Sequence, residues 1–126
     1  MLEDGTTFTY YRRGLKEFFE LVIQELPKSA HLIWLSSVVP NDGRQDKHWL
    51  KITNSYSVQK LNAIAAEVVS TYPRIQWLDT GHIPTSRSLE DGLGHGALHM
   101  RARYYRTIAD IIFRNLISTF GSDLVN

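Results

Sequence analysis

The sequence predicts an α/β fold with a parallel sheet. Two short apolar runs, at residues 31–37 and 74–79, flank a segment whose apolar side chains recur at three- and four-residue steps. A strand, a crossover helix and a second strand in this order form a right-handed parallel unit. The length of 126 residues and the hydrophobic content of 43% are typical of one globular domain. We therefore expect a single α/β domain over residues 1–126.

The first helix is expected over residues 10–26. Its apolar side chains fall on one helical face, namely Tyr11, Leu15, Phe18, Phe19, Val22, Ile23 and Leu26. Pro27 ends the helix, because proline has no N–H and disfavours helical geometry in the preceding residue. We expect Tyr10, Tyr11, Phe18 and Phe19 to be core or helix-packing groups.

Residues 31–37 form an apolar run that is too short for a helix and continuous rather than alternating. Such a run is typical of a strand that is covered on both faces. Residues 74–79 are expected to form the second strand. Trp34 and Trp77 lie in these strands and are expected in the core.

The two strands are connected by a loop over residues 38–54, which have no usable period, and by a helix over residues 57–72. Ser55 or Ser57 is available as the N-cap of this helix, because a hydroxyl oxygen can accept from its unpaired N–H groups. Pro73 closes the helix.

A glycine-containing loop is expected over residues 80–100, and a last helix over residues 104–120. A loop of about twenty residues is unusual inside a compact domain and suggests a function.

Two strands make a poor sheet, because typical sheets have about five. Weak strands in residues 1–9 and 38–54, a larger α/β domain of which this chain is the carboxyl-terminal part, or a partner chain would each resolve this. An incomplete sheet exposes apolar faces and an unpaired edge, so we expect the isolated chain to self-associate.

Composition excludes several classes of function. Fourteen Lys and Arg against 13 Asp and Glu give a net charge of +1, which does not favour a nucleic-acid partner. Without cysteine there is no disulfide and no thiol nucleophile. No apolar run approaches the ~20 residues that span a bilayer, and the acidic start does not resemble a signal peptide. The sequence identifies no cellular compartment.

Ligands of parallel sheets bind outside the carboxyl ends of the strands, and both long loops leave from there. This topology brings the following residues toward one edge: Asp42, His48, His82, Asp91, His95 and His99. An imidazole can take a proton from a hydroxyl nucleophile, and a carboxylate can hold the ring in the right tautomer. Asp91 with His95 or His99 supplies both groups. Alternatively, Asp91 caps a tight turn and the histidines are surface or helix-start residues.

Several short motifs carry a family resemblance: Leu61-Asn62 in a helix, the strand Ile75-Gln-Trp-Leu-Asp79 that follows it, Asp91-Gly92, His95 or His99, and Tyr105-Arg-Thr-Ile108-Ala109 in the last helix. Over residues 10–120 the chain resembles the carboxyl-terminal half of SGNH hydrolases, the GDSL-type esterases, in their PC-esterase-like branch. The resemblance implies a three-layer α/β/α, flavodoxin-like fold that is incomplete on the amino-terminal side. It also implies hydrolysis of ester bonds in small molecules, acetylated glycans or lipids.

The chain departs from the family in two ways. The family's Asp lies three residues before its His, whereas Asp91 precedes His95 by four residues and His99 by eight. We favour His99, which lies six residues before Tyr105, as the family's spacing implies. The family's Gly-Asp-Ser nucleophile block and its Gly and Asn oxyanion donors have no counterpart, so we expect the chain alone to be inactive.

Four serines are available as replacement nucleophiles: Ser36, Ser37, Ser86 and Ser88. Each is expected to be a strand-end or turn residue with a local backbone hydrogen bond, so none receives a catalytic assignment.

A zinc site formed by His95 and His99, with His82 or Asp91 as third ligand, requires a helix at these residues. Neighbouring glycines disfavour that helix, and no Glu follows His95 as it does in metalloproteases. We expect no metal and no cofactor.

The last helix carries a basic stripe of Arg103, Arg106 and Arg114, which Asp110 interrupts. Such stripes are usually solvated faces, so we expect no nucleic-acid binding. Two functions from different classes are left: a hydrolase-type domain, and a non-catalytic α/β interaction module.

Overall fold

The computed structural model describes residues 5–40, 42–44, 47–51, 53–81, 93–95, 99–100 and 102–125. Its elements in chain order are α1 (Gly5–Glu25), β1 (Leu32–Leu35), the 3₁₀ turn η1 (Asp42–Arg44), α2 (Lys47–Leu50), α3 (Ser55–Val69), β2 (Ile75–Leu78), β3 (Leu93–His95), β4 (His99–Met100) and α5 (Ala102–Val125). The chain is therefore of mixed α/β class.

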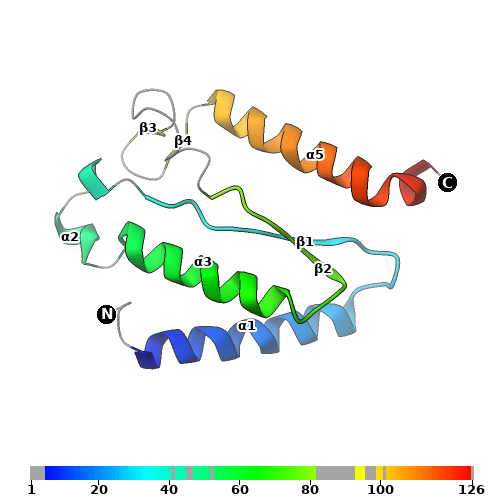
Figure 1. The fold of residues 1–126 in the computed structure, drawn as a ribbon, viewed down its shortest axis with the longest axis horizontal. Helices are drawn as coiled ribbons and strands as arrows, with labels where there is room; N and C mark the ends of the chain where they lie inside the picture. The colour runs from blue at the N-terminus through cyan, green and yellow to red at the C-terminus, as the bar shows by residue number, and fades with distance from the viewer. Residues whose placement is uncertain are drawn as a thin grey trace.

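β1 and β2 form a parallel pair joined by α3, which confirms the predicted unit. The register pairs Leu32 with Ile75 and Leu35 with Leu78. Both strands run toward the end of the molecule where η1, α2 and the hairpin β3–β4 lie (Figure 1). α1 and α3 lie on one side of the strand pair, and α5 lies on the other (Figure 1). The loops that follow the two strands thus leave from the same edge.

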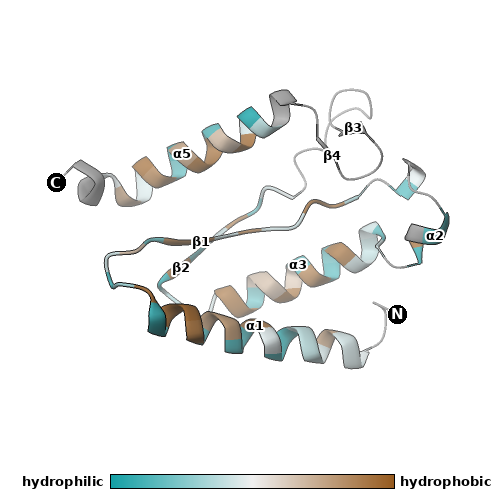
Figure 2. Cartoon of the chain, turned by 180° about the vertical axis from the view of Figure 1, so that it is seen from behind, coloured by the Kyte–Doolittle hydropathy of each residue, from teal (hydrophilic) through white to brown (hydrophobic). Residues whose placement is uncertain are grey.

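α1 begins at Gly5, several residues earlier than the periodicity predicts, and ends at Glu25, just before Pro27. Phe8 explains the earlier start, because it extends the apolar face by one turn and packs against the core. Hydrophobic and hydrophilic residues are interspersed along α1 and α3, the pattern of amphipathic helices (Figure 2).

The core lies between α1, α3 and one face of the strand pair. Its buried residues are Leu15, Phe19, Ile64, Ala65, Val68, Val69 and Ile75. The Phe19 ring forms edge-to-face pairs with Trp34 and Tyr72, with centroids 5.1 and 5.7 Å apart. Such edge-to-face pairs are favoured by the aromatic quadrupole. Trp34 and Trp77 pack against this cluster but are only partly buried.

Two of the aromatic residues predicted to pack lie at the margin of the core instead. Tyr10 is 62% exposed, which makes its assignment as a packing group wrong. Phe18 is 50% exposed, although its ring contacts those of Phe19 and Trp34. Both residues lie at the edge of the apolar face of α1 that packs against the core. The periodicity identifies the stripe but not its width.

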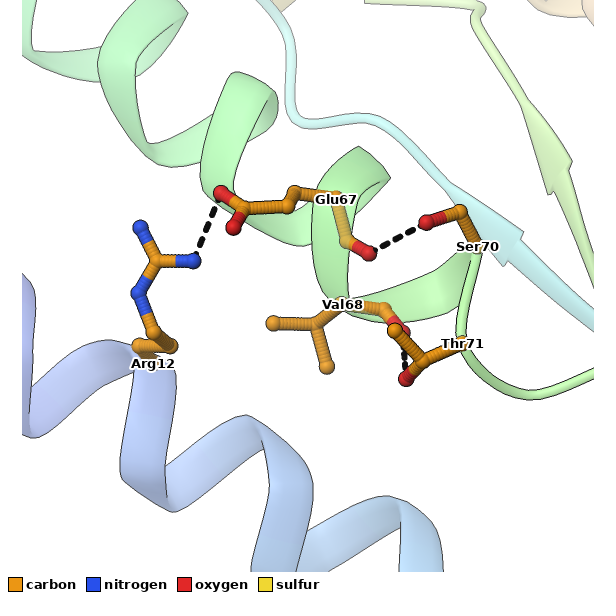
Figure 3. A network of polar contacts seen from close by, with 5 residues as sticks. All are labelled: Arg12, Glu67, Val68, Ser70 and Thr71. Atoms are coloured by element: carbon orange, nitrogen blue, oxygen red, sulfur yellow. Dashed lines mark hydrogen bonds and ion pairs between the residues drawn. The ribbon is translucent and has the colours of Figure 1, made fainter.

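An ion pair joins α1 to α3, and two hydroxyl groups bind carbonyl groups at the end of α3 (Figure 3). Arg12 pairs with Glu67 at 2.6 Å, and this contact lowers the pKa of the Glu67 carboxyl. The stabilisation is present above the carboxyl's unfolded pKa and is lost as the pH falls through the lowered one. Ser70 and Thr71 donate to the carbonyl groups of Glu67 and Val68, at 2.6 and 2.7 Å, where α3 ends.

The N-cap of α3 is Asn54, so the prediction of Ser55 or Ser57 is wrong. The Asn54 side chain accepts from the Ser57 N–H at 2.8 Å. Ser55 instead donates its backbone N–H and its hydroxyl to the Asp42 carboxylate, both at 2.7 Å. A carboxylate at this end of a helix is also favoured by the helix dipole.

The two predicted loops contain short elements. η1 and α2 lie within residues 38–54, and the antiparallel hairpin β3–β4 lies within residues 80–100. Four or fewer residues in each element are too few for a periodic pattern to reveal.

α5 contacts the strand pair through few described side chains. Gln76 donates to the Thr119 hydroxyl at 3.4 Å, and the His31 and Phe120 rings stack with centroids 3.9 Å apart. Phe113 and Ile117 of α5 are 60% and 50% exposed. The well-packed core is therefore the one on the α1 and α3 side.

We predict that Phe19→Ala lowers the free energy of unfolding by about 3–5 kcal/mol, the usual cost of removing a buried phenylalanine. Phe18→Ala, next to it but half exposed, should cost about 1 kcal/mol. Urea denaturation followed by circular dichroism measures both. Equal losses in the two variants would contradict the assignment of Phe19 to the core.

Candidate functional site

Polar side chains and backbone groups lie close together where β1 and β2 end. We call this group the strand-end cluster and define it as Ser36, Ser37, Asn62, Asp79 and Gly81. Ser36 and Ser37 follow β1, Asp79 and Gly81 follow β2, and Asn62 comes from α3. This is the edge of a parallel pair at which ligands bind in open α/β sheets.

The Ser36 hydroxyl joins the two strand ends. It donates to Asp79 Oδ1 at 2.8 Å and accepts from the Gly81 N–H at 2.7 Å, and Ser36 is 6% exposed. These contacts cross between the strands, so the expected local backbone bond of Ser36 is wrong. The single hydroxyl hydrogen is already donated to the Asp79 carboxylate, which leaves none for a catalytic base. Ser36 is therefore a positioning residue in this arrangement.

Asn62 fixes α3 to the end of β1. Its Oδ1 accepts from the Ser37 N–H, and its Nδ2 donates to the Ser37 carbonyl, both at 2.9 Å. Asn62 is 8% exposed, so the oxygen and the nitrogen of a buried carboxamide each have a hydrogen-bond partner. The residue forms the same pair of bonds that a neighbouring strand would form.

Gly81 allows the two chain segments to approach closely. A Cβ at this position would lie 2.0 Å from the Ser37 carbonyl oxygen, so no residue with a side chain fits without a shift of the backbone. The Gly81 carbonyl also accepts from the Val39 N–H at 2.9 Å. Gly81 thus continues the contact between the segments beyond the strands.

The structure places the six predicted site residues in different ways. The Asp42 carboxylate accepts two hydrogen bonds from Ser55, and His48 lies exposed in α2. His82 and Asp91 lie outside the described residues. His95 and His99 lie in β3 and β4, where their Cα atoms are register partners.

The hairpin β3–β4 therefore brings the backbones of His95 and His99 opposite each other. It lies at the end of the molecule toward which β1 and β2 run, directly before α5 (Figure 1). In the sequence, Asp91 lies two positions before β3.

Sequence reasoning missed the roles of Asn62, Asp79 and Gly81. A signal was present for two of them. Asn62 is a polar residue on the apolar face of a helix, and Gly81 follows a strand by three positions. Asp79 forms its bond with a residue 43 positions away, which no local pattern reveals.

Ser37 has its backbone bound to Asn62, and Ser86 and Ser88 lie outside the described residues. Among the described residues, no three His, Asp or Glu side chains gather to hold a metal ion. None of the helices in the described segments is long and apolar enough to cross a membrane.

A cavity of about 760 Å³ lies at the opposite end of the strands, lined in part by Lys28, His31, Arg74 and Phe120. Arg74 donates to the carbonyl groups of Ile23, at 3.1 Å, and Pro27, so its guanidinium group caps the end of α1. The cavity is separate from the strand-end cluster.

Comparisons with protein families, with curated proteins and with solved structures find no match to this chain.

We predict that Asn62→Asp destabilises the fold at pH 7 by about 1–3 kcal/mol or more, because a carboxylate accepts from Ser37 but cannot donate to its carbonyl. Burial and that carbonyl raise the folded-state pKa of the new carboxyl above its unfolded value of about 3.9. Stability is therefore regained as the pH falls through the raised pKa, because the protonated carboxyl can donate. Urea denaturation at pH 7 and pH 4 measures this change.

The matched control is Asn62→Ala, which loses both bonds at either pH. If Asn62→Asp loses the same free energy of unfolding at pH 7 as at pH 4, as Asn62→Ala is expected to do, the Asn62 side chain does not donate to the Ser37 carbonyl.

Proposed function

We propose that this chain is the carboxyl-terminal part of an SGNH (GDSL-type) ester hydrolase domain of the PC-esterase-like branch. In its complete form such a domain is a three-layer α/β/α fold with a flavodoxin-like parallel sheet. This chain contributes the acid/base element, and the Gly-Asp-Ser nucleophile block comes from elsewhere in that domain.

One observation carries the proposal. The parallel unit β1–α3–β2 has polar side chains at its carboxyl ends, and the hairpin that contains His95 and His99 lies at the same end of the molecule (Figure 1). A helix then leaves this hairpin. The resemblance to SGNH hydrolases implies the same order: a strand, a segment that contains the histidine, and a final helix.

The proposed roles follow from the chemistry of the groups. His99 takes the proton from the nucleophilic hydroxyl and returns it to the leaving group, with His95 as the alternative. Asp91 holds the imidazole in the right tautomer and stabilises its charged form. The strand-end cluster supports the site, because Ser36, Asp79 and Gly81 fix the start of the segment that leads to these residues.

The substrate class is an ester of a small molecule, or an acetylated glycan or lipid. Without a nucleophile and oxyanion donors, most of the rate enhancement is missing, so this chain alone is inactive.

A second function, a non-catalytic interaction module, is favoured by the apolar side chains on the surface. Tyr10 and Leu21, both on α1, are each more than half exposed. Such side chains are common at surfaces that bind other proteins when they are contiguous.

We predict that the imidazole of either His99 or His95 has a pKa above the unperturbed value of about 6.5, because the proposed Asp91 carboxylate beside it favours the charged ring. Asp91→Asn should lower the pKa of that imidazole alone. NMR titration of the five histidines in both proteins measures the change. His31 and His48, which lie in other elements, serve as internal controls.

Identical titration curves in the two proteins would exclude the Asp/His pair and favour the interaction module. A change at His95 instead of His99 would reverse the assignment of the base.

We also predict that the chain hydrolyses p-nitrophenyl acetate no faster than an equal concentration of free imidazole. Turnover that is lost in His99→Ala and retained in His95→Ala would contradict the proposed inactivity. Ser37, Ser86 and Ser88 would then be the candidates for the nucleophile.

A further inference from the structure

The outer face of α1 carries an apolar stripe, which we define as Thr7, Tyr10, Gly14, Phe18 and Leu21. Successive members are three or four residues apart, so they lie in one row along the helix. Tyr10, Phe18 and Leu21 are 62%, 50% and 56% exposed. The row has the spacing of a helix that packs against a second helix.

Gly14 makes a hollow at the middle of the α1 stripe. A Cβ added at Gly14 would have no atom within 4 Å, and the shallow surface depression that Gly14 lines with Tyr10, Phe18 and Trp34 is almost entirely apolar. Glycine is unfavourable inside a helix, and nothing within the described chain requires it here. A second helix that packs over the stripe can approach closely at this position.

The charges of α1 are divided along the helix. Arg13 lies on the amino-terminal side of Gly14, and Glu17 and Glu25 lie on its carboxyl-terminal side. The side chains of Arg13 and Glu17, which flank the stripe, are exposed. When two copies of such a helix pack antiparallel, Arg13 of each copy faces the acidic carboxyl-terminal part of the other.

We propose that the α1 stripe binds the α1 stripe of a second copy of this chain. The two helices run antiparallel about a twofold axis that passes beside Gly14. Tyr10 of each copy then packs near Phe18 of the other, and Arg13 of each lies near Glu17 of the other. A twofold interface of this kind is self-complementary, because each contact occurs twice.

Sedimentation equilibrium of the 126-residue chain at micromolar concentration tests the proposal. The unmodified chain should be a dimer. Arg13→Glu and Glu17→Arg should each raise the dissociation constant about tenfold or more, because each places like charges opposite each other twice. The double variant Arg13→Glu/Glu17→Arg should return it to within about threefold of the original.

Two control variants test whether the dimer forms through the α1 stripe and not through α3 or α5. Lys60→Glu reverses a charge on α3, and Phe113→Ala removes an exposed aromatic ring from α5, so neither should change the dissociation constant. Circular dichroism checks that each variant retains its helices. A monomeric unmodified chain, or a dimer that dissociates in Phe113→Ala but not in Arg13→Glu, would overturn the proposal.

The absence of cysteine gives a second, independent test. Gly14→Cys should form a disulfide-linked dimer under mild oxidation, because a residue beside the axis meets its own copy within the ~7 Å that a disulfide requires between Cα atoms. Lys60→Cys is the matched control and should stay monomeric on a non-reducing gel. Equal cross-linking of the two variants would contradict the position of the axis.

Discussion

The parallel pairing of β1 with β2 is the constraint on which the rest of the structure depends. Four residues in each strand pair in register, and α3 returns the chain between them. A pair this short has little stability of its own. Its stability comes from the apolar side chains of α1 and α3, with Phe19 packed against Trp34 and Tyr72.

The same pairing fixes the chemistry at the strand ends. Because the two strands run in one direction, Ser36 and Asp79 emerge side by side, and Gly81 allows the segments beyond them to touch. Asn62 then binds the Ser37 peptide group where a third strand is absent from the described residues. Four polar contacts thus hold the edge from which the histidine-containing segment leaves.

Much of this arrangement could be predicted from the sequence. The strands, the crossover helix and the first helix follow from the apolar runs and from Pro27 and Pro73, because local periodicity reports burial directly. The Asn54 cap and the Ser36–Asp79 bond could not be predicted in the same way. Ser55 donates its hydroxyl to Asp42, 13 positions earlier, and the Ser36–Asp79 bond joins residues 43 positions apart. The pairing of Asp91 with a histidine stays a prediction, since Asp91 lies outside the described residues.

NMR cross-strand contacts in the isotopically labelled chain test the parallel unit most directly. The structure predicts contacts between the backbones of Leu32 and Ile75 and between those of Leu35 and Leu78. Contacts that instead join Leu32 with Leu78 and Leu35 with Ile75 would show antiparallel strands. That result would remove the shared strand edge and, with it, both the strand-end cluster and the proposed site.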